Sequence, residues 1–238
     1  MAKKHLKRIT APKTWNVKPK GSKFIMRPLP GMHTLEFGMP LRVILESINA
    51  AKTGKEIKYL LTNKQVLVDG TRRKEPKFMV GLLDVLSLPE LKQHYRIVLN
   101  EHGYLTPVLI DAKEATLKLS KIIGKKMLRN NTLQLNLVDG RNILSTDAKQ
   151  KDAYAVGDVL LLSVPAQKIE QHLRMEKGSI ICLIGGKQKG VVGKVQEIKG
   201  STVTFATKEG TFITPAEYTM VVGKDKPLIT VTAGETHI

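Results

Sequence analysis

The stretch MPLRVILESINAAKTGKEIKYLLTNKQVLVDGTRRK, residues 39–74, decides the fold of this chain. Apolar residues recur at steps of three and four between Leu41 and Ala51, which predicts a helix with one apolar face. Thr53 is followed three residues later by Glu56, a capping-box pattern that predicts a second helix. In that helix, Ile57, Leu60 and Leu61 are expected to face inward.

A hairpin is predicted directly after the second helix. The apolar run 66–68 leads into Asp69-Gly70, a dipeptide typical of two-residue turns, and a basic strand start follows. Ordinary core helices and a solvated charged face remain open as alternative readings of the single elements. Basic residues are nevertheless concentrated in this one small unit: Arg42, Lys52, Lys55, Lys58, Arg72, Arg73, Lys74 and Lys77.

The overall charge points to a polyanionic partner. The 238 residues carry 39 Lys and Arg against 21 Asp and Glu, a formal charge of +18. Such an excess of positive charge repels itself in a compact state, so a polyanionic partner is expected. Nucleic acid is the leading candidate and an anionic membrane the main competitor. The remaining alternative is a soluble basic protein without such a partner. Aromatic residues make up only 5% of the chain, which favours several small units over one large core.

Residues 1–36 are predicted to form a basic extended arm. No acidic residue occurs in 1–35, and prolines prevent a continuous helix, so the arm alone is expected to be extended or disordered and to order on a polyanion. Trp15 could stack on a base, but packing against the folded body is the favoured reading. A transit peptide is disfavoured because Lys outnumbers Arg and serine is scarce. The candidate contacts in the arm are Lys3, Lys4, Lys7, Arg8, Lys13, Lys18, Lys20 and Lys23.

The middle of the chain changes to strand-like patterns. Residues 82–91 are interpreted as a segment that covers the two-helix unit, and strands are expected at 96–99, 105–110, 133–137 and 159–164. Turn signals about every ten residues predict a small β-barrel over 95–172.

A glycine- and lysine-rich loop follows the apolar strand at 180–184. Gly185, Gly186 and Gly190 are expected to let the loop turn tightly and bring its backbone N–H groups close to a partner, while Lys187, Lys189 and Lys194 supply charge. The loop lacks the final Lys-Ser/Thr of a phosphate-binding P-loop, and no helix pattern follows. A second small barrel is predicted over 173–222, with a frayed tail at 223–238.

Several function classes have no sequence support. The single cysteine, Cys182, excludes an internal disulfide and is expected in a buried strand, and the six histidines show no metal-ligand spacing. No catalytic constellation is present, so no enzyme activity, metal or cofactor is predicted. No apolar run is long enough for a membrane helix, and an intracellular, cytoplasmic protein is expected.

Two segments resemble known RNA-binding modules. Residues 39–84 look like the alpha-L RNA-binding fold, and residues 178–200 resemble the KOW motif of ribosomal proteins and elongation factors. The order of arm, alpha-L module, β-unit and KOW barrel, from Lys3 to about Val222, is similar to the e-type (archaeal and eukaryotic) family of small-subunit ribosomal protein number four.

The resemblance implies a structural ribosomal protein, located on the cytoplasmic ribosome and bound to small-subunit rRNA and neighbouring ribosomal proteins. It implies no cofactor and no catalysis. By matching position, it also implies that Arg42, Lys55, Lys58, Arg72 and Arg73 face RNA.

Two other functions remain as alternatives. One is a transcription or translation factor that uses the KOW barrel. The other is an rRNA pseudouridine synthase, but Gly140-Arg141-Asn142-Ile143 has isoleucine where the catalytic aspartate should stand.

The sequence therefore predicts an α+β, mostly β, multi-domain protein. The expected parts are the arm at 1–36, the alpha-L module with its covering segment at 37–94, a central β-barrel-like domain at 95–172, an SH3-like KOW barrel at 173–222 and the tail at 223–238.

Overall fold

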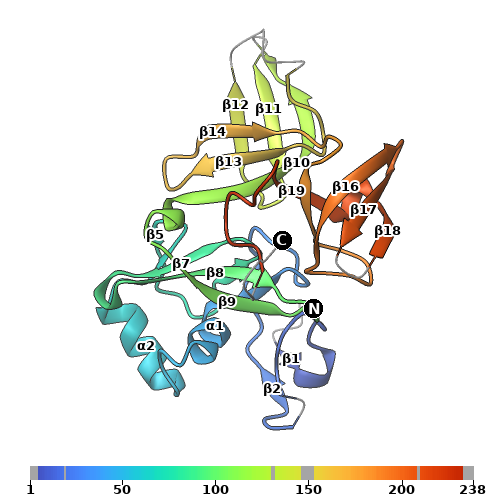
Figure 1. Ribbon diagram of the computed structural model, residues 1–238. Helices are drawn as coiled ribbons and strands as arrows, with labels where there is room; N and C mark the ends of the chain where they lie inside the picture. The colour runs from blue at the N-terminus through green and yellow to red at the C-terminus, as the bar shows by residue number, and fades with distance from the viewer. Residues whose placement is uncertain (1–4, 19, 130–131, 146–152, 208–209, 233–238) are drawn as a thin grey trace. The chain divides into compact units, whose positions relative to one another are not determined.

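The computed structural model describes residues 5–18, 20–129, 132–145, 153–207 and 210–232 (Figure 1). Within these ranges the protein is mostly β, with two α-helices and several antiparallel sheets. The chain divides into two compact units. The first comprises Met1–Val98 and Gly103–Thr116, and the second comprises Leu99–His102 and Leu117–Ile238.

Both predicted helices form in the first unit. Helix α1 (Leu41–Ser47) buries Leu41, Ile44 and Leu45, but it ends before Ala51 because Asn49 turns the backbone to a φ of +55°. Helix α2 (Gly54–Asn63) begins with the predicted capping box. The Thr53 hydroxyl accepts from the Glu56 N–H at 3.3 Å, and the Glu56 carboxylate accepts from the Thr53 N–H at 3.4 Å.

The predicted hairpin also forms. Strands β4 (Leu67–Val68) and β5 (Thr71–Arg72) pair antiparallel across Asp69 and Gly70, whose φ values of +49° and +71° define a type I′ turn. Strand β3 (Gly38–Pro40) pairs antiparallel with β6 (Met79–Gly81), and β3 contacts α1.

The interpretation of residues 82–91 as a covering segment is wrong. They contain β7 (Val85–Leu88), an inner strand of a five-stranded sheet in the order β5-β4-β7-β8-β9, with β8 at Gln93–Leu99 and β9 at Leu105–Ile110. All four residues of β7 are buried, and strands pair with it on both sides. The sheet therefore carries the first unit past the expected boundary at 94.

The arm is not extended throughout. Strand β1 (Leu6–Lys7) pairs with β2 (Phe24–Ile25), and a short 3₁₀ turn, Arg8–Thr10, follows β1. Trp15 is buried, with 4% of its surface exposed, and its indole N–H donates to the Gly38 carbonyl at 3.0 Å. The favoured expectation that Trp15 packs against the folded body is thus confirmed.

The second unit holds two five-stranded sheets. The first has the order β12-β11-β10-β13-β14. A bulge between Ile122 and Gly124 bends its longest strand, so that the sheet curves into a half-barrel around one leucine-rich core. Its strands are β10 (Leu117–Met127), β11 (Leu133–Leu137), β12 (Asn142–Ser145), β13 (Val159–Ser163) and β14 (Lys168–Leu173).

The second sheet has the order β18-β17-β16-β15-β19. Its strands are β15 (Ile180–Leu183), β16 (Val192–Lys199), β17 (Thr202–Thr207), β18 (Gly210–Pro215) and β19 (Thr219–Gly223). The expectation of a frayed tail from 223 is wrong for the part of the tail that the structure describes. Ile229 and Val231 are buried, and the Leu228 N–H donates to the Val222 carbonyl at 2.9 Å.

A buried lysine joins these two sheets. Lys121 on β10 has 6% of its surface exposed, and its ammonium group donates to the carbonyls of Ala216, Glu217 and Thr219 at 2.9, 2.8 and 2.7 Å. Burial lowers the pKa of Lys121 to about 8, so the group is still mostly protonated at neutral pH. Three acceptors for three N–H bonds make this a specific structural tie.

The capping box generates the first prediction. Replacing Thr53 by alanine should lower the free energy of unfolding by about 1 kcal/mol, since one helix N–H loses its acceptor. Chemical denaturation measures this change. Thr62→Ala, on the exposed side of the same helix, is the control and should change stability by less than about 0.5 kcal/mol. Equal effects of the two changes would contradict the role of the cap.

The second prediction concerns Lys121. Lys121→Met should destabilise the protein by roughly 3 kcal/mol, because three inward carbonyls lose their donor. The folded pKa of about 8 lies below the ordinary value of 10.5, so between these pH values the unfolded chain binds more protons. The stability advantage of the parent over the variant should therefore grow as pH rises from 8 to 10.5. Denaturation curves of both proteins across this pH range measure the difference in their free energies of unfolding. A difference that stays constant or falls with pH would contradict the prediction.

Candidate nucleic-acid interface

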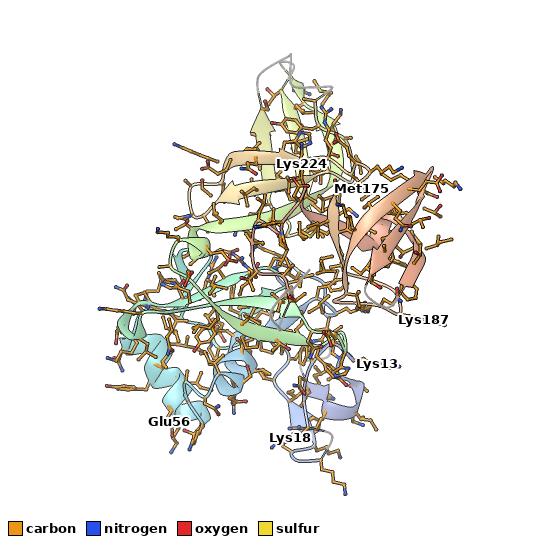
Figure 2. All side chains as sticks on the ribbon, in the orientation of Figure 1. Lys13, Lys18, Glu56, Met175, Lys187 and Lys224 are labelled. Carbon is orange, nitrogen blue, oxygen red and sulfur yellow. The ribbon has the colours of Figure 1, made fainter. Side chains whose placement is uncertain are left out.

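Most of the predicted contact residues that the structure describes have exposed side chains, and a smaller group is half-buried. Lys3 and Lys4 lie outside the described residues. The half-buried group is Arg8, Arg42, Arg73 and Lys189. The exposed group is Lys7, Lys13, Lys18, Lys20, Lys23, Lys52, Lys55, Lys58, Arg72, Lys74, Lys77, Lys187 and Lys194. Figure 2 labels Lys13 and Lys18 in the arm and Lys187 in the loop between β15 and β16.

Helix α2 presents the simplest basic surface. Ile57 and Leu61 are fully buried on one side, which leaves Lys55 and Lys58 exposed on the other. The carboxylate of Glu56, the acidic residue of the first turn, is held by backbone hydrogen bonds at the start of the helix and does not pair with these lysines. Its carboxylate accepts from the Lys52 backbone N–H at 2.9 Å, and this bond, followed by those from Thr53, lowers the pKa of Glu56. The two lysines therefore remain available to a partner.

Arg72 contributes to the fold as well as to the surface. Its guanidinium donates to the carbonyls of Thr62 at 3.0 Å and Lys64 at 3.4 Å, at the end of α2 where the last carbonyls lack helix partners. A cation there also complements the helix dipole. The resemblance implies only an RNA-facing role for Arg72, and the structure adds this role at the end of α2.

Two further arginines have intramolecular contacts. The Arg73 guanidinium lies 4.3 Å from the centre of the Phe78 ring, in a cation–π contact. The Arg42 Nε donates to the Glu46 carboxylate at 2.7 Å, one helical turn away. Alanine at Arg42, Arg72 or Arg73 would thus change the fold as well as the charge, whereas substitution of Lys55 or Lys58 tests the charge alone.

Two glycines of the 184–191 loop, Gly185 and Gly190, are required by internal packing. A side chain at Gly190 would place Cβ 2.1 Å from the Asn100 carbonyl oxygen, and one at Gly185 would lie 2.4 Å from the Tyr218 ring. The Gly190 N–H already donates to the Leu183 carbonyl at 2.8 Å. The prediction that these glycines bring backbone N–H groups to a partner is therefore wrong for Gly190, because neighbouring chain fills that space.

Titratable side chains elsewhere form pairs. His33 contacts the buried Asp84 carboxylate at 3.0 Å, and His172 contacts Asp158 at 2.6 Å. Among the described residues, no group of three or more His, Cys, Asp and Glu is placed to hold a metal ion. Over the same residues, no helix is long and apolar enough to cross a membrane. Cys182 lies on β15 as expected, and burial raises the pKa of its thiol to about 12.

Small β-rich modules with exposed lysines are typical of proteins that bind nucleic acid through their surface. Family models agree with this class. Residues 2–36 match the RS4NT (NUC023) domain, and residues 91–169 match the ribosomal family S4e.

Whole-chain relatives carry one description, small ribosomal subunit protein eS4. The protein of Methanosphaera stadtmanae is 41% identical over 96% of this chain and 95% of its own, and that of Methanocella arvoryzae is 40% identical over 96% and 98%. The crystal structure of 30S ribosomal protein S4e from Thermoplasma acidophilum matches with a TM-score of 0.67 and 29% identity, covering 79% of this chain and 95% of that one. The chain belongs to the S4e family of small ribosomal subunit proteins. It is a structural ribosomal protein and not an enzyme.

The loop glycines generate the third prediction. Gly190→Ala should destabilise the protein by more than about 2 kcal/mol, because a positive φ of 85° and a backbone clash with Asn100 combine. Gly186→Ala is the matched control. Its φ is +83°, but the nearest atom to the added Cβ is 3.8 Å away, so only the conformational cost of about 1 kcal/mol is expected. Thermal unfolding of both variants would refute the packing role if their losses were the same.

Proposed function

We propose that the protein binds small-subunit rRNA through lysine–phosphate contacts distributed over its separate modules, and that neighbouring small-subunit proteins complete its environment. The observation that carries this proposal is the exposed side of α2. Lys55 and Lys58 project there opposite the buried Ile57 and Leu61, and among the described residues neither ammonium group has an intramolecular partner.

The physical basis is shape recognition of the RNA backbone. An A-form RNA duplex hides its base edges in a deep, narrow major groove, so rigid basic surfaces recognise its phosphates and 2′-hydroxyls. Each lysine that meets a phosphate releases condensed counterions, which makes affinity fall steeply with salt. The candidate contacts are therefore the exposed lysines of the arm, of residues 52–77 and of residues 187–194, with Arg72 adding charge while it holds the end of α2.

The finer architecture supports a division of labour. We assign the arm at 1–36 and the two-helix module to the first unit, the β10–β14 half-barrel to a central barrel-like domain, and the β15–β19 sheet to an SH3-like KOW barrel. The order of strands in the last sheet and the position of Lys187 and Lys189 between β15 and β16 support the KOW assignment. No observation favours the transcription-factor or pseudouridine-synthase alternatives.

The fourth prediction tests the α2 surface. The double variant Lys55→Gln/Lys58→Gln should bind small-subunit rRNA roughly tenfold more weakly, because two phosphate contacts are lost. The slope of log affinity against log salt should fall by about 2. Filter binding across a salt series measures both quantities.

Lys113→Gln is the matched control, since it removes one exposed lysine of the same unit that lies outside the proposed surface. It should leave the affinity within about twofold of the parent and flatten the salt slope by less than 1. An unchanged salt slope in the double variant, with the fold intact by circular dichroism, would exclude the α2 surface as a contact.

A further inference from the structure

The structure singles out an aromatic residue that sequence reasoning did not. Trp15 is buried, whereas Phe24 on β2 has 50% of its surface exposed. Register places Phe24 directly opposite Lys7, on the outward side of the β1–β2 pair. No acidic residue occurs in 1–35, so Lys and Arg are the only Asp/Glu/Lys/Arg-type charged residues in this part of the sequence.

Among the described residues, two side chains contact the Phe24 ring. The His5 ring meets it edge-on, with centroids 5.5 Å apart and planes at 84°. The Lys23 ammonium group lies 5.8 Å from the ring centroid. A single exposed apolar side chain is ordinary on a protein surface. Here, however, the exposed ring has two lysines next to it, Lys7 in register on β1 and Lys23 beside the ring.

The backbone around this ring is held by Arg8. The Arg8 Nε donates to the Ser22 carbonyl at 3.0 Å, one Nη donates to the Ser22 hydroxyl at 3.2 Å, and the other donates to the Lys18 carbonyl. The Arg8 backbone N–H donates to the Lys23 carbonyl at 3.0 Å. Arg8 is thereby engaged within the arm. Lys18 and Lys23 are attached to an organised segment, which lowers the entropy cost of binding.

This arrangement suits an unpaired nucleotide better than a duplex. A base can stack on an aromatic face only where it is not already stacked within a helix, and single-stranded loops and bulges offer such bases. Lysines beside the ring meet the flanking phosphates. We propose that Phe24 is a stacking platform for an unpaired base of small-subunit rRNA, with Lys7 and Lys23 on the adjoining phosphates. This inference rests on the proposed rRNA binding and gives the arm a specific ligand.

The test uses the full chain and a transcript of small-subunit rRNA from Methanosphaera stadtmanae, the source of a 41% identical relative. Phe24→Leu keeps an apolar side chain and removes the ring, so affinity should fall roughly 5- to 50-fold with an unchanged salt slope. Phe24→Tyr should bind within about twofold of the parent, because it restores the ring. Lys7→Gln/Lys23→Gln should instead flatten the slope by about 2.

Ile9→Ala is the control, because Ile9 is an apolar residue of the same arm with 90% of its surface exposed but no ring. It should leave affinity unchanged. A 12-nucleotide RNA strand containing 2-aminopurine adds a direct readout: quenching of its fluorescence on binding should be lost in Phe24→Leu.

The outcomes separate the two proposals. If the parent fails to bind the transcript, the proposed function falls. If the parent binds with a steep salt slope but Phe24→Leu equals it within twofold, the stacking platform alone is overturned. Unchanged RNA affinity of Phe24→Leu together with poorer incorporation into small subunits also overturns it, and indicates that the ring docks on a protein.

Discussion

A formal charge of +18 repels itself within the folded chain, and this electrostatic repulsion is the constraint on where the cations can lie. A few are taken into the interior and compensated there. Arg96 is fully buried on β8, where its guanidinium pairs with Glu114 and burial lowers its pKa. Lys118 lies 3.4 Å from the buried Asp139 carboxylate, and Lys121 is held by three carbonyls. Removing one partner of such a site leaves an uncompensated buried group, which is strongly destabilising.

The cations that remain outside the core fall into two chemical kinds. Arginines supply planar, multiple donors and here tie the fold together: Arg8 in the arm and Arg72 at the end of α2. Lysines such as Lys55 and Lys58 remain outside as compact charges on flexible stems. This division follows from their chemistry, because a guanidinium can bind several carbonyls at once and still expose an edge to a phosphate. Binding and stability are therefore separable at Lys55 and Lys58 and coupled at Arg8 and Arg72.

Local patterns predicted the local structure well. The capping box at Thr53 and Glu56 and the type I′ turn at Asp69-Gly70 formed as expected, since both depend on contacts within four residues. Predictions that needed partners distant in sequence were less accurate. Strand β7 was mistaken for a covering segment because a short apolar run does not show which strands will flank it. The described part of the tail packs through Ile229 and Val231, a burial that its polar composition concealed.

The sequence by itself determined the excess of positive charge, the two-helix and hairpin unit and the positions of the basic residues, because charge and short-range periodicity are properties of the chain. Tertiary structure alone decided which of these residues are free to bind. It placed Asn100 against Gly190, buried Trp15 and left Phe24 exposed. It also brought Lys121 to carbonyls almost a hundred residues away. The physical reason is that burial and hydrogen-bond partners depend on strand pairing and packing between distant segments, which no local pattern specifies.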